Sequence, residues 1–232
     1  MWQKDRRGFL VQCAAASGAL IMPATLITPA LATVPKAQRP EVSPTEDLMR
    51  EHGVLNRVLL VYDECLRRLT EKELIGPKVI ADSAELIRTF IEQYHEKIEE
   101  EHIFPRFRKA GKLVELVDTL QKQHEAGRRV TARIHQIAQG PLESDSDRQQ
   151  MRQQLQAFIK MYRPHEARED TVLFPALHDI VTRKEFDAMG DQFEEIERKT
   201  FHGEGFEKAR DKVAEIEKSL GIYDLAEFTP KE

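Results

Sequence analysis

Residues 94–105 read YHEKIEEEHIFP and residues 162–175 read YRPHEAREDTVLFP. Each stretch holds a histidine followed four residues later by a glutamate, and each glutamate precedes a Phe-Pro pair by five residues. Positions i and i+4 lie one turn apart on the same face of an α-helix, so an imidazole and a carboxylate at this spacing can contact one ion. The two stretches are therefore two copies of one helical half-site.

The repeat extends to the helices that precede the two stretches. His52 and His124 are each followed, five and six residues on, by an Arg-Val pair. From the first to the second histidine of a copy the separation is 43 residues in one half and 41 in the other. This self-similarity indicates the internal duplication of a helical hairpin.

The hydrophobic pattern predicts an all-α protein. Apolar residues recur at three-to-four spacing in four segments that begin near residues 44, 77, 113 and 145, and no segment alternates with the two-residue period of a strand. Ser43 and Pro44 form an N-cap and first-turn signal for the first helix. We expect residues 43–180 to form an up-down-up-down four-helix bundle.

Residues 181–232 show helix signals without a chemical motif. Thr182 and Glu185 match a capping box for a helix that ends near Phe201, and residues 206–219 are amphipathic. We expect this C-terminal helical extension to pack outside the bundle.

The first 32 residues predict an export signal. A charged start precedes an apolar run of small residues that ends in Ala-Leu-Ala, and Arg6 with Arg7 resembles a twin-arginine signal. The sequence thus predicts a periplasmic or otherwise exported protein. Pro23 and Pro29 interrupt the apolar run, so we expect no stable membrane insertion after cleavage. Residues 33–42 have no hydrophobic period and are interpreted as a linker.

Charge and cysteine content exclude several kinds of site. The net charge is −5, with acidic and basic residues interleaved, so no basic face for nucleic acid is present in the sequence. Cys13 belongs to the predicted signal, and the single remaining Cys65 excludes an intramolecular disulfide. Its apolar neighbours at helical spacing predict a core position for Cys65.

The repeated histidines and glutamates lie on the same helix faces as leucine and isoleucine. Buried imidazoles and carboxylates are costly without partners, and a metal ion satisfies all of them together. A mixed nitrogen and oxygen donor set suits iron, manganese or zinc, and iron is the first choice. The alternatives are solvent-facing pairs and a metal-free structural bundle. The predicted ligands are His52, His95, Glu99, His124, His165 and Glu169.

These residues resemble the hemerythrin-like HHE-domain proteins, which are non-haem di-iron four-helix bundles. The resemblance covers about residues 43–180. It implies two iron ions in a centre of the Fe–O–Fe type, with the four histidines as terminal ligands and Glu99 and Glu169 as bridges. This set of four histidines and two glutamates is most similar to the bacterial family linked to the repair of iron centres after nitrosative damage.

Two positions bear on the details of this resemblance. Oxygen-carrying hemerythrins have HxxxH in their third helix, whereas Arg128 stands four residues after His124, so simple reversible oxygen carriage is not expected. They also use HxxxxD in the last helix, and Asp170 has that offset from His165. Asp170 is thus an alternative bridge to Glu169, which is preferred for its symmetry with Glu99.

The other polar candidates receive weaker expectations. Glu96, Glu100 and Glu101 are interpreted as a solvated face, with Glu100 as a fallback ligand, and His102 as a second-sphere residue, a residue controlling access or a polar core substitution. Default core packing is expected for Tyr62, Tyr94 and Tyr162, and ordinary surface or interface roles for His135, His178 and His202.

Three functions follow as hypotheses. The first is a di-iron oxidoreductase or detoxifier acting on O2, NO or peroxide in oxidative or nitrosative stress, with an electron donor that the sequence does not identify. The second is an oxygen or NO sensor, or an iron-handling protein, that binds without turnover. The third is a purely structural bundle.

Overall fold

The computed structural model describes residues 42–230. The predicted twin-arginine signal and nearly all of the predicted linker lie outside the described residues. Regular structure in the described part of the chain is entirely helical. The prediction of an all-α protein is therefore confirmed.

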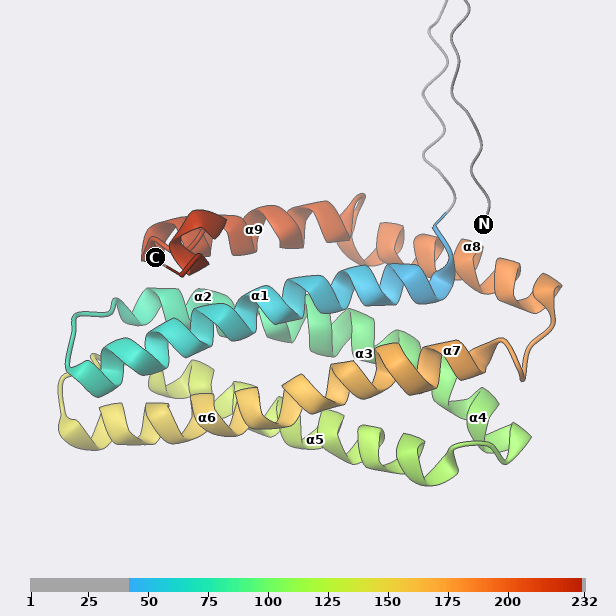
Figure 1. Ribbon diagram of the computed structural model, residues 1–232, viewed down its shortest axis with the longest axis horizontal. Coiled ribbons are helices and arrows are strands. Elements are labelled where there is room, and N and C mark those ends of the chain that lie inside the picture. The colour runs from blue at the N-terminus through green and yellow to red at the C-terminus, as the bar shows by residue number, and fades with distance from the viewer. Residues whose placement is uncertain (1–41, 231–232) are drawn as a thin grey trace, which may run out of the picture. The chain divides into compact units, whose positions relative to one another are not determined.

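The bundle consists of four long helical segments. Its sides are α1 (Pro44–Glu71), the run from α2 (Pro77–Leu86) to α4 (Phe104–Ala110), α5 (Val114–Ile137), and α6 (Asp145–Arg168) with its continuation α7 (Phe174–Leu177). Around the bundle, α1 packs against α6, α6 against α5, and α5 against α2 (Figure 1). Neighbours run in opposite directions, as expected for an up-down-up-down bundle.

Two of the four segments contain wider, π-helical turns. They lie at η1 (Ile87–His95) and η2 (Glu99–Ile103), with α3 (Glu96–Ile98) between them, and at η3 (Glu169–Leu173). Such turns bond residue i to residue i−5 and occur frequently at functional sites. Here η2 and η3 each begin at one of the repeated glutamates.

The repeated Phe-Pro pairs account for these two turns. A proline has no N–H and crowds the carbonyl four residues before it, so the regular ladder cannot continue at that point. The N–H of Phe104 bonds instead to the carbonyl of Glu99, and the N–H of Phe174 bonds to that of Glu169. The duplication seen in the sequence is thus also a duplication of backbone geometry.

Pro164, unlike the prolines of the Phe-Pro pairs, lies inside a regular α-helix. The sequence predicts a kink or a register adjustment just before His165. In the structure α6 continues through Pro164 to Arg168, and the wider turn comes only at η3.

The core fills the space between the four segments. Its largest fully buried side chains are aromatic, and Tyr62 meets Phe158 edge to face with ring centroids 5.3 Å apart. Cys65 is fully buried beside them as a free thiol, as predicted. Within the described residues no helix is both long and apolar enough to cross a membrane.

The C-terminal extension covers one side of the bundle. Its helices α8 (Arg183–Phe201) and α9 (Gly205–Leu220) pack against α1, and α9 also contacts α2 (Figure 1). The capping box of Thr182 and Glu185 is complete. An ion pair between Arg57 and Glu217 fastens α9 to α1.

Candidate metal centre

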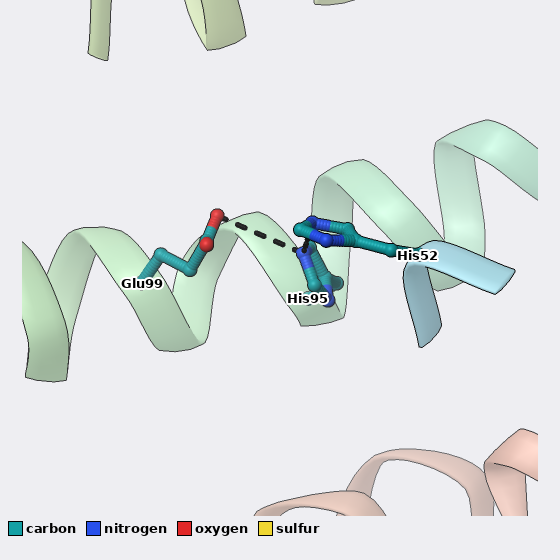
Figure 2. Close-up of side chains that lie close together, drawn as sticks. All are labelled: His52, His95 and Glu99. Carbon is teal, nitrogen blue, oxygen red and sulfur yellow. Dashed lines mark hydrogen bonds and ion pairs between the residues drawn. The ribbon is translucent and has the colours of Figure 1, made fainter. Parts of the chain in front are cut away.

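Four histidines meet in the interior of the bundle, one from each long segment. His52 lies on α1, His95 at the end of η1, His124 on α5 and His165 on α6, and each is at most 4% exposed. They form two pairs, with Nε2 of His52 3.0 Å from Nε2 of His95, and Nε2 of His124 3.2 Å from Nε2 of His165. Figure 2 shows the first pair together with Glu99.

The two repeated glutamates lie between these pairs and are fully buried. Oε2 of Glu169 is 3.2 Å from Nε2 of His165 and 3.4 Å from Nε2 of His52. Oε2 of Glu99 is 3.7 Å from Nε2 of His95 and 3.4 Å from Nε2 of His124. Each carboxylate therefore contacts one histidine of its own copy and one histidine of the other copy.

The carboxylate oxygens in the centre fit a cation. Both oxygens of Glu99 and both of Glu169 are buried, and none accepts a hydrogen bond from the described residues. Buried polar atoms of native proteins are almost always paired, and an unpaired carboxylate is especially costly. Among the described residues, three groups of donors lie close enough to hold an ion. Two are in the centre, namely His52 with His95 and Glu99, and His124 with His165 and Glu169; the third joins His124 to Glu96 and Glu100.

The structure distinguishes Glu169 from Asp170 by position. Glu169 faces Nε2 of His52 in the centre, whereas Oδ1 of Asp170 lies 2.7 Å from Nδ1 on the far side of the same ring. The side chain of Asp170 is also 32% exposed. Asp170 thus occupies an outer position.

Every histidine of the centre has such an outer acceptor. His95 Nδ1 is 2.6 Å from Glu51, His124 Nδ1 is 3.2 Å from Glu100, and His165 Nδ1 is 2.9 Å from Gln123. When Nδ1–H donates outward, the lone pair of Nε2 points inward, which is the tautomer that a metal ligand requires.

The Phe-Pro pairs also contribute to the centre directly. The ring of Phe174 stacks on His52 with centroids 5.6 Å apart, and the ring of Phe104 stacks on His124 at 5.4 Å. Both phenylalanines are fully buried. They orient the two imidazoles and separate them from solvent.

Burial and charge set the protonation of the acids. Burial raises the pKa of Glu99 well above its usual range, and the charge of Glu169 adds to this effect. Burial acts in the same direction on Glu169, but contacts with His165 and His52 outweigh it and hold its pKa well below the usual range. A cation between the two carboxylates favours the ionised form of both.

Burial and hydrogen bonding also shift the pKa values of the ligand His124 and of its outer acceptor Glu100. Burial lowers the pKa of His124 to about 4, so the ring is neutral near pH 7, as a metal ligand must be. Burial opposes ionisation of Glu100, but hydrogen bonds from His124, Lys97 and Arg128 lower its pKa to about 2.

The expectation of a solvated acidic face is wrong for Glu96 and fits only Glu101. Glu96 is buried, accepts a hydrogen bond from the hydroxyl of Tyr162 at 2.8 Å and pairs with Arg128 at 2.8 Å. Glu100, the fallback ligand, lies on the outer side of His124. Arg128, four residues after His124, forms ion pairs with both of these glutamates.

The remaining candidates lie away from the centre. His102 is half-buried, with its ring 5.8 Å from that of Phe193. Tyr62 and Tyr94 are buried in the core. The other three histidines lie on α5, after α7 and at the end of α8, namely His135, His178 and His202.

Sequence reasoning missed the outer residues Glu51 and Gln123. Each immediately precedes the first histidine of its copy, and this shared position was the signal that could have identified them. A residue next to a ligand on a helix points about 100° away from it, so adjacency alone does not predict which ring the side chain contacts.

The part of the chain that forms this centre matches a known domain family. The model of the hemerythrin HHE cation binding domain matches residues 43–177. The chain belongs to the hemerythrin HHE family. This HHE-domain protein is also similar to uncharacterized proteins of Mycobacterium bovis and of two Mycobacterium tuberculosis strains. Each is 46% identical over 199 residues, which cover 85% of this chain and 78% of the relative. No solved structure matches the chain.

Proposed function

We propose that this HHE-domain protein holds two iron ions between its two histidine pairs and binds a small oxidant, O2, NO or H2O2, in defence against oxidative or nitrosative stress. One observation carries the proposal: Glu99 and Glu169 each contact a histidine from both pairs. Together with the four histidines, these two carboxylates would hold two cations, as glutamates and histidines do in other carboxylate bundles. Manganese and zinc suit the same donors.

The chain's own residues hold and shield this centre. The outer acceptors fix the ring orientation of all four histidines, and Phe104 and Phe174 keep water from two of them. Bound iron would supply Lewis acidity and redox chemistry toward the oxidant. The protein contributes a buried set of nitrogen and oxygen donors with fixed orientations.

In the test, the iron-loaded protein is reduced and kept without oxygen, and each oxidant is then added separately. We expect its optical spectrum to change on addition of O2, NO or H2O2, and the oxidant to be consumed when a chemical reductant is supplied. Glu99→Ala and Glu169→Ala should abolish both signals. An iron-loaded wild type that neither changes its spectrum nor consumes any of the three would overturn the proposal.

Binding without turnover is the second candidate, and one contact favours it. Arg57 follows His52 by five residues on α1 and pairs with Glu217 of α9, so a ligand helix is tied directly to the C-terminal extension. A sensor would show a spectral response without oxidant consumption. It would also show altered protease cleavage within residues 181–232 when the oxidant is bound.

We further propose that residues 1–32 direct export through the twin-arginine pathway to the periplasm. The support is the charged start with Arg6 and Arg7 before an apolar run. Replacing both arginines with lysine should retain the protein in the cytoplasm, as measured by cell fractionation. Unchanged export of that variant would contradict the assignment.

A further inference from the structure

The two histidine pairs differ in their outer acceptors, although the duplication gives them the same layout. Glu51 and Gln123 occupy the same place in the two copies, directly before the first histidine. Glu51 presents a carboxylate oxygen 2.6 Å from Nδ1 of His95, whereas Gln123 presents an amide oxygen 2.9 Å from Nδ1 of His165. One imidazole is thus paired with an acid and its counterpart with a neutral group.

The outer acceptors of the other two histidines, His52 and His124, also differ in how much negative charge they present. Asp170 contacts Nδ1 of His52 at 2.7 Å, while Glu100 contacts Nδ1 of His124 at 3.2 Å. Glu100 is shared with two cations, Lys97 at 2.6 Å and Arg128 at 2.5 Å.

The acceptors of the first pair, Glu51 and Asp170, have no such cationic partners among the described residues. Within the described part of the chain, no lysine or arginine forms an ion pair with Glu51 or with Asp170. When a bound cation favours the ionised form of Glu51, the negative charge behind the first pair is uncompensated by direct contact, whereas the charge behind the second pair is neutralised.

Such differences change how strongly an imidazole binds a metal. A carboxylate that accepts the Nδ1 proton makes Nε2 more basic and adds a negative charge near the ion. A neutral amide fixes the ring without adding charge. Removal of an outer partner of this kind typically lowers metal affinity 10-fold to 100-fold.

We propose that the two metal positions are unequal, so that the position at His52 and His95 fills first and holds its ion more tightly than the position at His124 and His165. Glu51 and Gln123 act as positioning residues that set this order. The proposal rests on the proposed function, because it requires that both pairs bind a metal. It assigns the exchangeable ion to the second pair.

The test is a stepwise titration of the metal-free protein with Zn²⁺, followed by ¹⁵N NMR of the histidine side chains. In the wild type we expect the resonances of His52 and His95 to change with the first equivalent and those of His124 and His165 with the second. Glu51→Gln should weaken the first step about 10-fold or more, and Gln123→Glu should strengthen the second. The two substitutions are matched, since they exchange the same two side chains at equivalent positions.

The outcomes separate this proposal from the function on which it rests. A protein that binds no Zn²⁺ in any variant overturns both. Two bound ions with simultaneous filling, or with the second pair filling first, overturn only the order proposed here. Unchanged affinities in both Glu51→Gln and Gln123→Glu also overturn it. Because the two substitutions act on different helices, a folding defect in one leaves the other as an independent test.

Discussion

Oε2 of Glu169 lies 3.4 Å from Nε2 of His52, although the two residues belong to opposite copies of the sequence duplication. The counterpart contact joins Glu99 to His124 at the same distance of 3.4 Å. Each copy thus contributes a carboxylate to the histidine pair of the other copy. Each half supplies three donors close enough to hold one ion, and its carboxylate also contacts a histidine of the other half, so the two-ion centre depends on the packing of both hairpins.

The first prediction separates the inner acid from the outer one. Glu169→Gln removes a charge from the centre, where an amide cannot bridge two cations, and most of the bound iron should be lost. Asp170→Asn changes only the outer acceptor of His52, and two ions should still bind with about 10-fold lower affinity. Metal analysis after dialysis against a graded chelator measures both. Loss of iron in Asp170→Asn with retention in Glu169→Gln would assign the bridge to Asp170.

The second prediction concerns two helical glycines with opposite surroundings. A Cβ at Gly127 would overlap the hydroxyl of Tyr162, which donates to Glu96, whereas a Cβ at Gly53 meets nothing within 4 Å. Gly127→Ala should lower the free energy of unfolding of the metal-free protein by about 1–3 kcal/mol. Gly53→Ala, the matched control, should raise it by roughly 0.5–1 kcal/mol because alanine favours the helix. Urea denaturation decides, and equal effects would contradict the predicted clash.

The third prediction is a loss of stability of the metal-free protein between pH 6.5 and 8. Burial raises the pKa of Glu51 and of Glu96 to about 8 and that of Asp47 to about 7. The folded state therefore keeps protons that the unfolded chain has released, and the free energy of unfolding falls as pH rises. His95 and His124 have lowered pKa values and act in the opposite sense, but only up to their ordinary pKa near 6.5.

The size of this effect is on the order of 1 kcal/mol for each buried acid across the window. Urea denaturation of chelator-treated protein at several pH values measures it. Glu96→Gln removes one of the titrating groups and should make the fall shallower. A free energy of unfolding that rises between pH 6.5 and 8 would be incompatible with protonated acids in the folded core.

The inner ligands were predictable from sequence because they depend on local geometry. His95 with Glu99, and His165 with Glu169, share a helix face through their four-residue spacing, and the duplication identified the helices that carry the other two histidines. The all-α bundle followed from the same periodicity. The interpretation of Asp170 was left open because sequence spacing alone allows either acid to reach the centre.

The outer shell was not predictable in the same way. Asp170 contacts His52 and Glu100 contacts His124 across the two copies, so these pairs arise only when the hairpins pack. Glu96 was interpreted as part of a solvated face, but it is buried and pairs with Tyr162 of α6 and Arg128 of α5. These partners come from other helices, so the local sequence around Glu96 does not indicate them.

The central claim is that the four histidines and two glutamates together hold two metal ions. The most direct measurement is the metal content of the protein by mass spectrometry after expression with iron, compared with that of Glu99→Ala and Glu169→Ala. We predict about two iron ions per wild-type chain, since the six ligands match the two-ion centres of carboxylate bundles, and a marked loss in both variants. Well under one ion per wild-type chain, or variants that keep the full content, would contradict it.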